Sequence, residues 1–119
     1  QPIVKGDLFC ITQIFSNLID NAIKFTNTGG VEIILTQNKK KKITVEISDT
    51  GIGISEEFIP KLFEPFSQEE QGYTRSFDGN GIGMALVKKY CEMNDINIEV
   101  RSEKNKGTTF TLTFQQTIN

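Results

Sequence analysis

The fold of this chain is decided by the stretch NLIDNAIKFT, which occupies residues 17–26. It forms the second half of a helix that the apolar spacing predicts over residues 7–25. Within that helix Asn17, Asn21 and Lys24 lie at positions i, i+4 and i+7, so they share one face. Two asparagines carry a cost that helix formation does not explain, because the asparagine side chain competes for backbone hydrogen bonds.

This polar helix face has two interpretations, and the spacing alone favours neither. One is a solvated surface that has no chemical role. The other is a binding site, because an amide oxygen is a hard ligand suited to Mg²⁺ and a lysine supplies the counter-charge for a phosphate. In the second interpretation the three side chains hold a metal-bound triphosphate.

Outward from this helix, the sequence predicts strands and helices in separate runs. The predicted elements are strands over 31–37 and 43–49, a short helix over 55–63, a helix over 81–94, and strands over 96–102 and 108–114. Because the strands form mostly antiparallel pairs, this order predicts an α+β fold. We expect a two-layer sandwich whose mixed, mostly antiparallel sheet is covered on one face by three helices.

The sequence also predicts details of these elements. Asp7 is expected to cap the first helix. Pro60 fits a straight helix poorly, so the short helix should start late or bend. Residues 67–79 are polar and aperiodic, which is typical of an exposed loop. The second long helix is expected to bury Ile82, Leu86, Tyr90 and Met93.

Composition limits the class of protein. At 119 residues the chain has room for one domain, residues 1–119, and 37% hydrophobic with 24% charged residues is a soluble globular composition. A net charge of −2 gives no reason to expect nucleic acid or a membrane as a partner. The sequence contains no histidine, which excludes a histidine-based triad, a histidine-ligated zinc and a histidine phosphoacceptor within this chain.

The remaining features of the sequence point to the cytoplasm. Cys10 and Cys91 lack metal-binding spacing and are interpreted as buried thiols in a reducing compartment, with a disulfide as the alternative. No apolar stretch approaches the roughly 20 residues of a membrane span, and the N-terminus has no signal-peptide core. Ile3 and Val4 suggest a first strand, and the abrupt start suggests a piece of a longer protein.

Asp49 breaks the pattern of the strand that it ends. It lies in phase with the apolar Ile43, Val45 and Ile47, so its carboxylate points toward the core and requires hydrogen-bond donors. Thr50-Gly51-Ile52-Gly53 follows at once, and its glycines allow a ligand to approach the backbone. The exocyclic amine of a planar base would satisfy the carboxylate. A turn-capping aspartate is the alternative.

The glycine cluster Asp78-Gly79-Asn80-Gly81-Ile82-Gly83 opens the second long helix. Free N–H groups at a helix start form an anion site, and glycines admit phosphate oxygens. The sequence contains no GxxxxGK[ST] motif, and the earlier Gly51-Ile52-Gly53 lacks the third glycine of a Rossmann turn. Thr108 is a further exception, since it places a hydroxyl in phase with Phe110, Leu112 and Phe114.

Together and in this order, these residues resemble the catalytic and ATP-binding domain of sensor histidine kinases, a member of the Bergerat-fold ATP-binding superfamily. The resemblance covers nearly the whole chain. The stretches that carry it are similar to the asparagine box at 17–26, the first glycine box at 49–54, the phenylalanine box at 62–66, the second glycine box at 79–86 and the last glycine box at 107–110. Met84 stands where the family usually has leucine.

The resemblance implies a role for residues of the first two boxes. Asn21 would coordinate Mg²⁺ through its amide oxygen, with Asn17 beside it as a second candidate ligand. Lys24 would contact phosphate and Phe25 would line the pocket. The adenine contacts would come from Asp49, Thr108 and bound water, while Gly51 and Gly53 would admit the purine.

The resemblance also implies roles for the later boxes. Residues 67–80 would form the ATP lid, with Arg75 as a phosphate contact and Phe63 and Phe66 at its base. Paired aromatic residues are also compatible with a purely structural role. The nucleotide-binding residues of the second glycine box would be Gly79, Gly81, Gly83 and Leu86.

Asn17 bears on the reaction. In the related chaperone, topoisomerase and mismatch-repair ATPases this position holds a glutamate that activates water, and anti-sigma serine kinases resemble that pattern. An amide cannot accept a proton at neutral pH, so the resemblance favours phosphoryl transfer to histidine, whose imidazole already carries a lone pair. An ATPase, a serine kinase or a non-catalytic nucleotide-binding module are the alternatives.

The resemblance implies partners as well. ATP and Mg²⁺ would be the cofactors, and ADP would also bind. Because the chain has no histidine, the acceptor would lie on a His-bearing dimerisation domain, with a response regulator downstream. We expect the isolated domain to be monomeric and cytoplasmic, without direct membrane contact, although the parent protein could be membrane-anchored.

Overall fold

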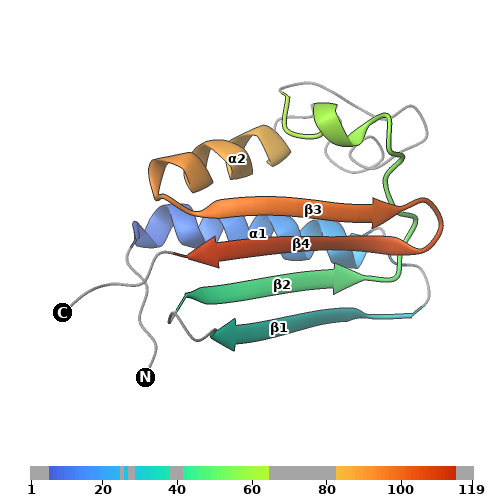
Figure 1. Ribbon diagram of the computed structural model, residues 1–119, viewed down its shortest axis with the longest axis horizontal. Helices are drawn as coiled ribbons and strands as arrows, with labels where there is room; N and C mark the ends of the chain where they lie inside the picture. Colours follow the sequence, from blue (N-terminus) through green and yellow to red (C-terminus); the bar gives the residue numbers. More distant parts are fainter. Residues whose placement is uncertain (1–5, 25, 27–28, 38–41, 65–82, 115–119) are drawn as a thin grey trace.

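Four strands form one sheet in the computed structural model, which describes residues 6–24, 26, 29–37, 42–64 and 83–114 (Figure 1). The strands are β1 (Val31–Gln37), β2 (Ile43–Asp49), β3 (Asn97–Glu103) and β4 (Gly107–Phe114), in the spatial order β1-β2-β4-β3. Every pairing among them is antiparallel. Within the described residues the sheet is therefore wholly antiparallel rather than mixed.

The two central strands carry most of the core. Alternate residues of β2 and β4 are buried, as expected for strands with one face on a core. In the register, Ile47 lies opposite Phe110 and Val45 lies opposite Leu112, so large apolar side chains meet in rows across the sheet. The edge strand β1 is exposed along nearly its whole length.

Two α-helices of the described residues, α1 (Leu8–Lys24) and α2 (Gly83–Met93), form the second layer (Figure 1). As predicted, Asp7 caps α1, because the Cys10 N–H donates to its Oδ1 at 3.0 Å. Asn94 then joins the two helices: its Oδ1 accepts from the Asp7 N–H at 2.7 Å, and its Nδ2 donates to the Tyr90 carbonyl at 2.8 Å. The start of α1 is thus fastened to the end of α2.

The third helix is shorter than predicted. Residues 55–63 form a turn followed by η1 (Ile59–Lys61), a single 3-10 turn that includes Pro60. Because proline has no N–H and clashes with the preceding turn, the helical turn starts late, at Ile59, as the sequence predicted. The α+β sandwich itself is confirmed, with two α-helices and this 3-10 turn among the described residues.

The predicted buried face of the second long helix was wrong for Leu86 and Met93, which are 41% and 64% exposed. The residues of α2 that face the core are Met84, Val87 and Cys91. Both stripes are apolar at helical spacing, so periodicity could not decide which one packs against the sheet. Ile82 lies outside the described residues.

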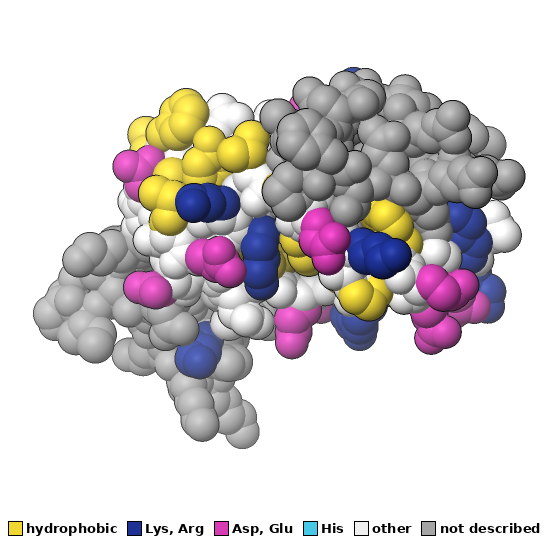
Figure 2. Space-filling view, turned by 90° about the horizontal axis from the view of Figure 1, so that it is seen from above, with side chains coloured by type: hydrophobic (Ala, Val, Ile, Leu, Met, Phe, Trp, Pro, Cys, Tyr) yellow, Lys and Arg dark blue, Asp and Glu magenta, His cyan; other side chains and the backbone are white. Residues whose placement is uncertain are grey.

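Exposed apolar side chains also occur on α1. Figure 2 shows hydrophobic side chains gathered at one end of the face that it views, with acidic and basic side chains interspersed beside them. The most exposed of the large apolar side chains are Leu8, Phe9, Leu35 and Met93.

Cys10 and Cys91 are buried and free, as predicted.

Candidate functional site

Three polar side chains form a row across the end of the sheet. Asp49 on β2 is the register partner of Thr108 on β4, and Thr108 is in turn the partner of Ser102 on β3. All three lie in the phase of the strands that faces the helices, next to the apolar row that contains Ile47 and Phe110. Polar side chains thus replace apolar ones in a single layer of the core, which we call the polar row.

Asp49 is a buried carboxylate, with 6% of the residue exposed. Its Oδ1 accepts a hydrogen bond of 2.8 Å from the Gly51 N–H. Burial raises the pKa of Asp49 above its ordinary value, while the backbone N–H groups of Gly51 and Thr108 oppose this rise because they stabilise the charged form. Burial dominates, so the carboxylate is under-solvated and suited to accept a further donor.

The loop after Asp49 is packed tightly against the turn between β3 and β4. The Asn105 N–H donates to the Ile52 carbonyl at 2.7 Å. Gly53 has φ +74°, and a Cβ added to it would clash with the carbonyl oxygen of Glu103. The close approach of the chain to itself therefore requires glycine at this position. The predicted contact of Gly53 with a purine stays a prediction.

Asn21 is the second buried polar residue of the candidate site. It lies in the last turn of α1 with 3% of the residue exposed, and its Oδ1 is buried and accepts no hydrogen bond from the described residues. An unpaired buried acceptor costs about 1–3 kcal/mol. An amide oxygen of this kind is a suitable ligand for a hard cation such as Mg²⁺, so the residue fits the predicted metal.

The neighbouring residues of α1 differ from Asn21. The Nδ2 of Asn17 donates to the Gln13 carbonyl at 2.9 Å, which directs its amide along the helix, and the residue is half-buried. Lys24 is exposed at the end of α1. The described residues contain no cluster of three or more His, Cys, Asp or Glu side chains that could hold a metal ion.

The candidate residues come together at one end of the molecule. The last turn of α1, the end of β2, the start of β4 and the N-terminal end of α2 all lie toward the same side (Figure 1). Gly83 begins α2, and Phe63 is tied to that helix because the Lys88 ammonium lies 5.8 Å from its ring centroid. Leu86 is on the surface of α2. The predictions that lie outside the described residues are the lid over 67–80 with Arg75 and Gly79, and the residues Phe25, Phe66 and Gly81.

Sequence reasoning missed Ser102. The Ile54 N–H donates to its Oγ at 2.7 Å, Ser102 donates to the Gly107 carbonyl at 2.9 Å, and its Oγ lies 2.8 Å from the Oγ1 of Thr108. The available signal was its phase, since Ser102 follows the core-facing Ile98 and Val100 at a spacing of two. The same reasoning had identified Thr108.

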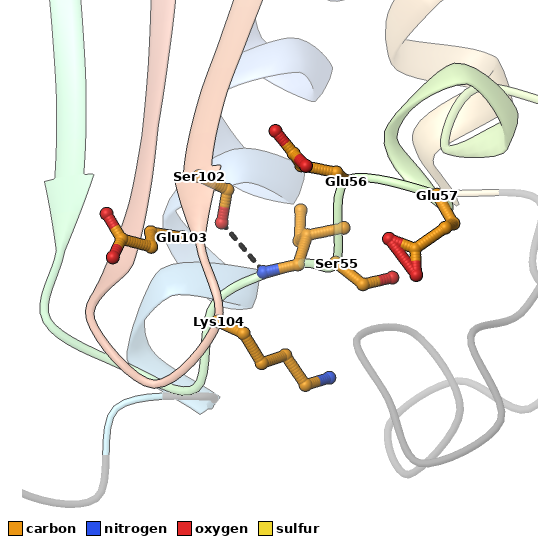
Figure 3. A pocket seen from close by; sticks show the side chains of 7 residues that line it. Ser55, Glu56, Glu57, Ser102, Glu103 and Lys104 are labelled. Carbon is orange, nitrogen blue, oxygen red and sulfur yellow. Dashed lines mark hydrogen bonds between the residues drawn. The ribbon is translucent and has the colours of Figure 1, made fainter.

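A pocket of about 480 Å³ opens beside Ser102, between the β3–β4 turn and the segment before η1 (Figure 3). It includes neither Asn21 nor Asp49. Three of its side chains are glutamates and one is a lysine, so the pocket carries a net negative charge that would repel a polyphosphate. The lining residues are Ile54, Ser55, Glu56, Glu57, Ser102, Glu103 and Lys104.

Comparisons with known proteins agree on one family. Residues 6–118 match the family model described as "Histidine kinase-, DNA gyrase B-, and HSP90-like ATPase". The chain is 43% identical over 108 residues to the autoinducer 2 sensor kinase/phosphatase LuxQ of Vibrio parahaemolyticus, which covers 87% of this chain and 13% of that protein. It is 38% identical over 109 residues to the sensor histidine kinase RcsC of Escherichia coli, which covers 92% of this chain and 11% of that protein.

Solved structures show the same similarity. Full-length ShkA in complex with AMPPNP matches with a TM-score of 0.83 and 26% identity, over 100% of this chain and 24% of that one. The catalytic domain of histidine kinase ThkA matches with a TM-score of 0.75 and 26% identity. The match covers 93% of this chain and 70% of that one. This chain spans only a small part of the curated relatives, and none of its described helices is long and apolar enough to cross a membrane.

Proposed function

Because the chain belongs to the family of histidine kinase-, DNA gyrase B- and HSP90-like ATPases, we propose that it binds Mg-ATP and supplies the γ-phosphoryl group to a histidine on another domain. The observation that carries this proposal is a pair of buried acceptors at one end of the fold: the Asp49 carboxylate, which accepts from the Gly51 N–H, and the Asn21 amide oxygen, which has no partner among the described residues. An adenine amine and a metal ion would satisfy one each.

The polar row would bind the base. Ionised Asp49 only accepts hydrogen bonds, so it suits the exocyclic amine of adenine, and Thr108 lies beside it as a second polar group, with water completing the contacts. Gly51 donates its N–H to Asp49 and so holds the carboxylate in place. We propose that Gly53 and Phe63 shape the nucleotide-binding site around Asp49, and that Leu86 lies at its surface.

The phosphates would lie toward the end of α1. Asn21 would hold the metal through Oδ1, with Asn17 as a second candidate, and Lys24 would contact phosphate. The metal, when bound, neutralises phosphate charge. Gly83 at the start of α2 would contribute the N–H groups and the positive dipole end that favour anions. The proposed roles of Phe25, Arg75, Gly79 and Gly81 concern positions outside the described residues.

The acceptor would be a histidine of another domain, since this sequence has none. A lone pair of the imidazole nitrogen would attack the γ-phosphorus of ATP and form a nitrogen–phosphorus bond. The bond between the γ-phosphorus and the oxygen that bridges it to the β-phosphate would break, and ADP would leave. Asn17 cannot act as a base toward water, and an imidazole needs none to expose its lone pair. Positioning and neutralisation of charge would then be sufficient for the transfer.

The partners follow from this role. They would be a His-bearing dimerisation domain and, downstream, a response regulator. We propose that the isolated domain is a monomer and that it lies in the cytoplasm, where ATP is available, without nucleic acid or direct membrane contact. A membrane anchor would belong to the parent protein.

The test is transfer of labelled phosphate. The domain is mixed with a His-bearing dimerisation domain and γ-labelled ATP, and acid-labile, base-stable label is expected on that partner. Asp49→Asn should sharply reduce the label. Steady phosphate release by this domain alone, lost in Asn17→Ala, would instead support an ATPase or serine kinase, and nucleotide binding without transfer would support a non-catalytic module.

A further inference from the structure

The hydrogen bonds of Ser102 fix the direction of the proton on Thr108. A serine hydroxyl has one proton and two lone pairs, and a carbonyl oxygen can only accept. Since Ser102 donates to the Gly107 carbonyl at 2.9 Å, its only proton is used there. The 2.8 Å contact between the hydroxyls of Ser102 and Thr108 must then be donated by Thr108.

The second lone pair of Ser102 is also occupied. The Ile54 N–H donates to it at 2.7 Å, which is the dashed bond in Figure 3. Ser102 therefore accepts two hydrogen bonds and donates one, so every position of its hydroxyl is filled by a described group. The remaining contact of Ser102, at 2.8 Å, is then the one in which Thr108 donates its proton.

Thr108 consequently presents only lone pairs to the space beside Asp49. The ionised carboxylate of Asp49 is also a pure acceptor, and the two residues are register partners on adjacent strands. A group that brings two N–H donors is matched by these two acceptors. A carbonyl oxygen at the same place would face two acceptors and no donor.

We propose that Ser102 is a specificity-determining residue that makes the site select a 6-amino purine over a 6-oxo purine by holding Thr108 as an acceptor. This inference rests on the proposed function, in which Asp49 and Thr108 meet the base. Ser102 acts through Thr108 and is a positioning residue, since it does not itself contact the base. Without it, the Thr108 hydroxyl would be free to turn and donate to a 6-oxo group.

The experiment compares Mg-ATP with Mg-ITP, which differ at the purine 6-position and in the N1 proton that accompanies it. Calorimetric titration of the wild-type chain should show preference for ATP. In Ser102→Ala the ratio of the two dissociation constants should fall by about five- to tenfold, the size of one hydrogen bond. Because both nucleotides are measured on the same folded variant, general loss of stability does not change the ratio.

Ser48→Ala is a matched control. Ser48 and Thr109 form an equivalent hydroxyl pair, 2.9 Å apart, in the opposite phase of β2 and β4. This variant should keep the wild-type ratio. Ser102→Thr retains the hydroxyl and should restore it. In a Thr108→Val background, Ser102→Ala should change the ratio no further, since its effect passes through Thr108.

The outcomes separate the two proposals. Tight ATP binding with the same ATP:ITP ratio in wild type and Ser102→Ala would overturn this inference and leave the proposed function intact. A fall in the ratio that persists in the Thr108→Val background would also overturn it. Absence of ATP binding by the wild-type chain would overturn the proposed function and this inference with it.

Discussion

Asp49 lies directly opposite Thr108 on the neighbouring strand, and both residues are almost fully buried. A carboxylate and a hydroxyl thus occupy a layer that the strand pattern would fill with two apolar side chains. Such a pair weakens the core unless a ligand completes it. The same position therefore has a cost in the free domain, and in the proposed function it binds the nucleotide.

Replacing Asp49 by Asn should strongly weaken nucleotide binding and raise the melting temperature of the free domain. The amide keeps the shape and can still accept from the Gly51 N–H, but it removes a charge that burial destabilises. The affinity for ATP should fall about tenfold or more, because a hydrogen bond to a charged group is lost. Calorimetry and thermal unfolding measure the two effects. Retained affinity would remove Asp49 from the site.

The stability difference between wild type and Asp49→Asn should depend on pH. Burial raises the pKa of Asp49 in the folded state above its ordinary 3.8, so the folded domain binds the proton more tightly than the unfolded chain does. The stability that this provides is present below pH 3.8 and is lost as pH rises through the raised pKa. Chemical denaturation between pH 3.5 and 7 should therefore show the advantage of the variant growing with pH. A constant difference would mean that the pKa is not raised.

Asn21→Leu should stabilise the nucleotide-free domain by about 1 kcal/mol, because it removes a buried acceptor that has no partner among the described residues. It should also abolish the Mg²⁺ dependence of nucleotide binding. Asn17→Leu is the matched control on the same helix: it gains the same helix propensity, but its amide already donates to the Gln13 carbonyl. Urea denaturation compares the two variants. An equal gain in both would show that the Asn21 oxygen carries no penalty.

Gly53→Ala should destabilise the domain by at least about 2 kcal/mol, because a Cβ at φ +74° is strained and would clash with the Glu103 carbonyl. Gly30→Ala is the control, since an added Cβ there meets nothing within 4 Å, and its effect should stay within about 0.5 kcal/mol. Guanidinium denaturation distinguishes them. Equal stabilities would show that the loop after β2 can move away from the β3–β4 turn.

Sequence patterns predicted most of the sheet and part of the site. The bounds of β1 and β2 agree residue for residue, because each run of residues is limited by clear turn signals. The burial of Asp49 and Thr108 followed from their phase in the strands. Phase is a local property, so it can be read without knowing the partner strand.

Properties that depend on neighbours distant in the chain could not be predicted. Helix α2 has two apolar stripes, and the stripe that is buried is the one that packs against the sheet. Val87 is therefore buried, whereas Met93 is exposed. The need for glycine at position 53 comes from Glu103, fifty residues further on. The bonding of Ser102 depends on three segments that converge only in the folded chain.

The hydrogen bonds between these segments have a consequence for the entropy of binding. The loop after β2 and the β3–β4 turn are joined by the bonds from Asn105 to Ile52 and from Ile54 to Ser102, so the groups around Asp49 are ordered before any ligand arrives. An adenine ring bound beside Asp49, as we propose, would then immobilise little at this end of the site. Its recognition should carry a small entropic penalty, and folding itself performs the ordering that binding would otherwise require.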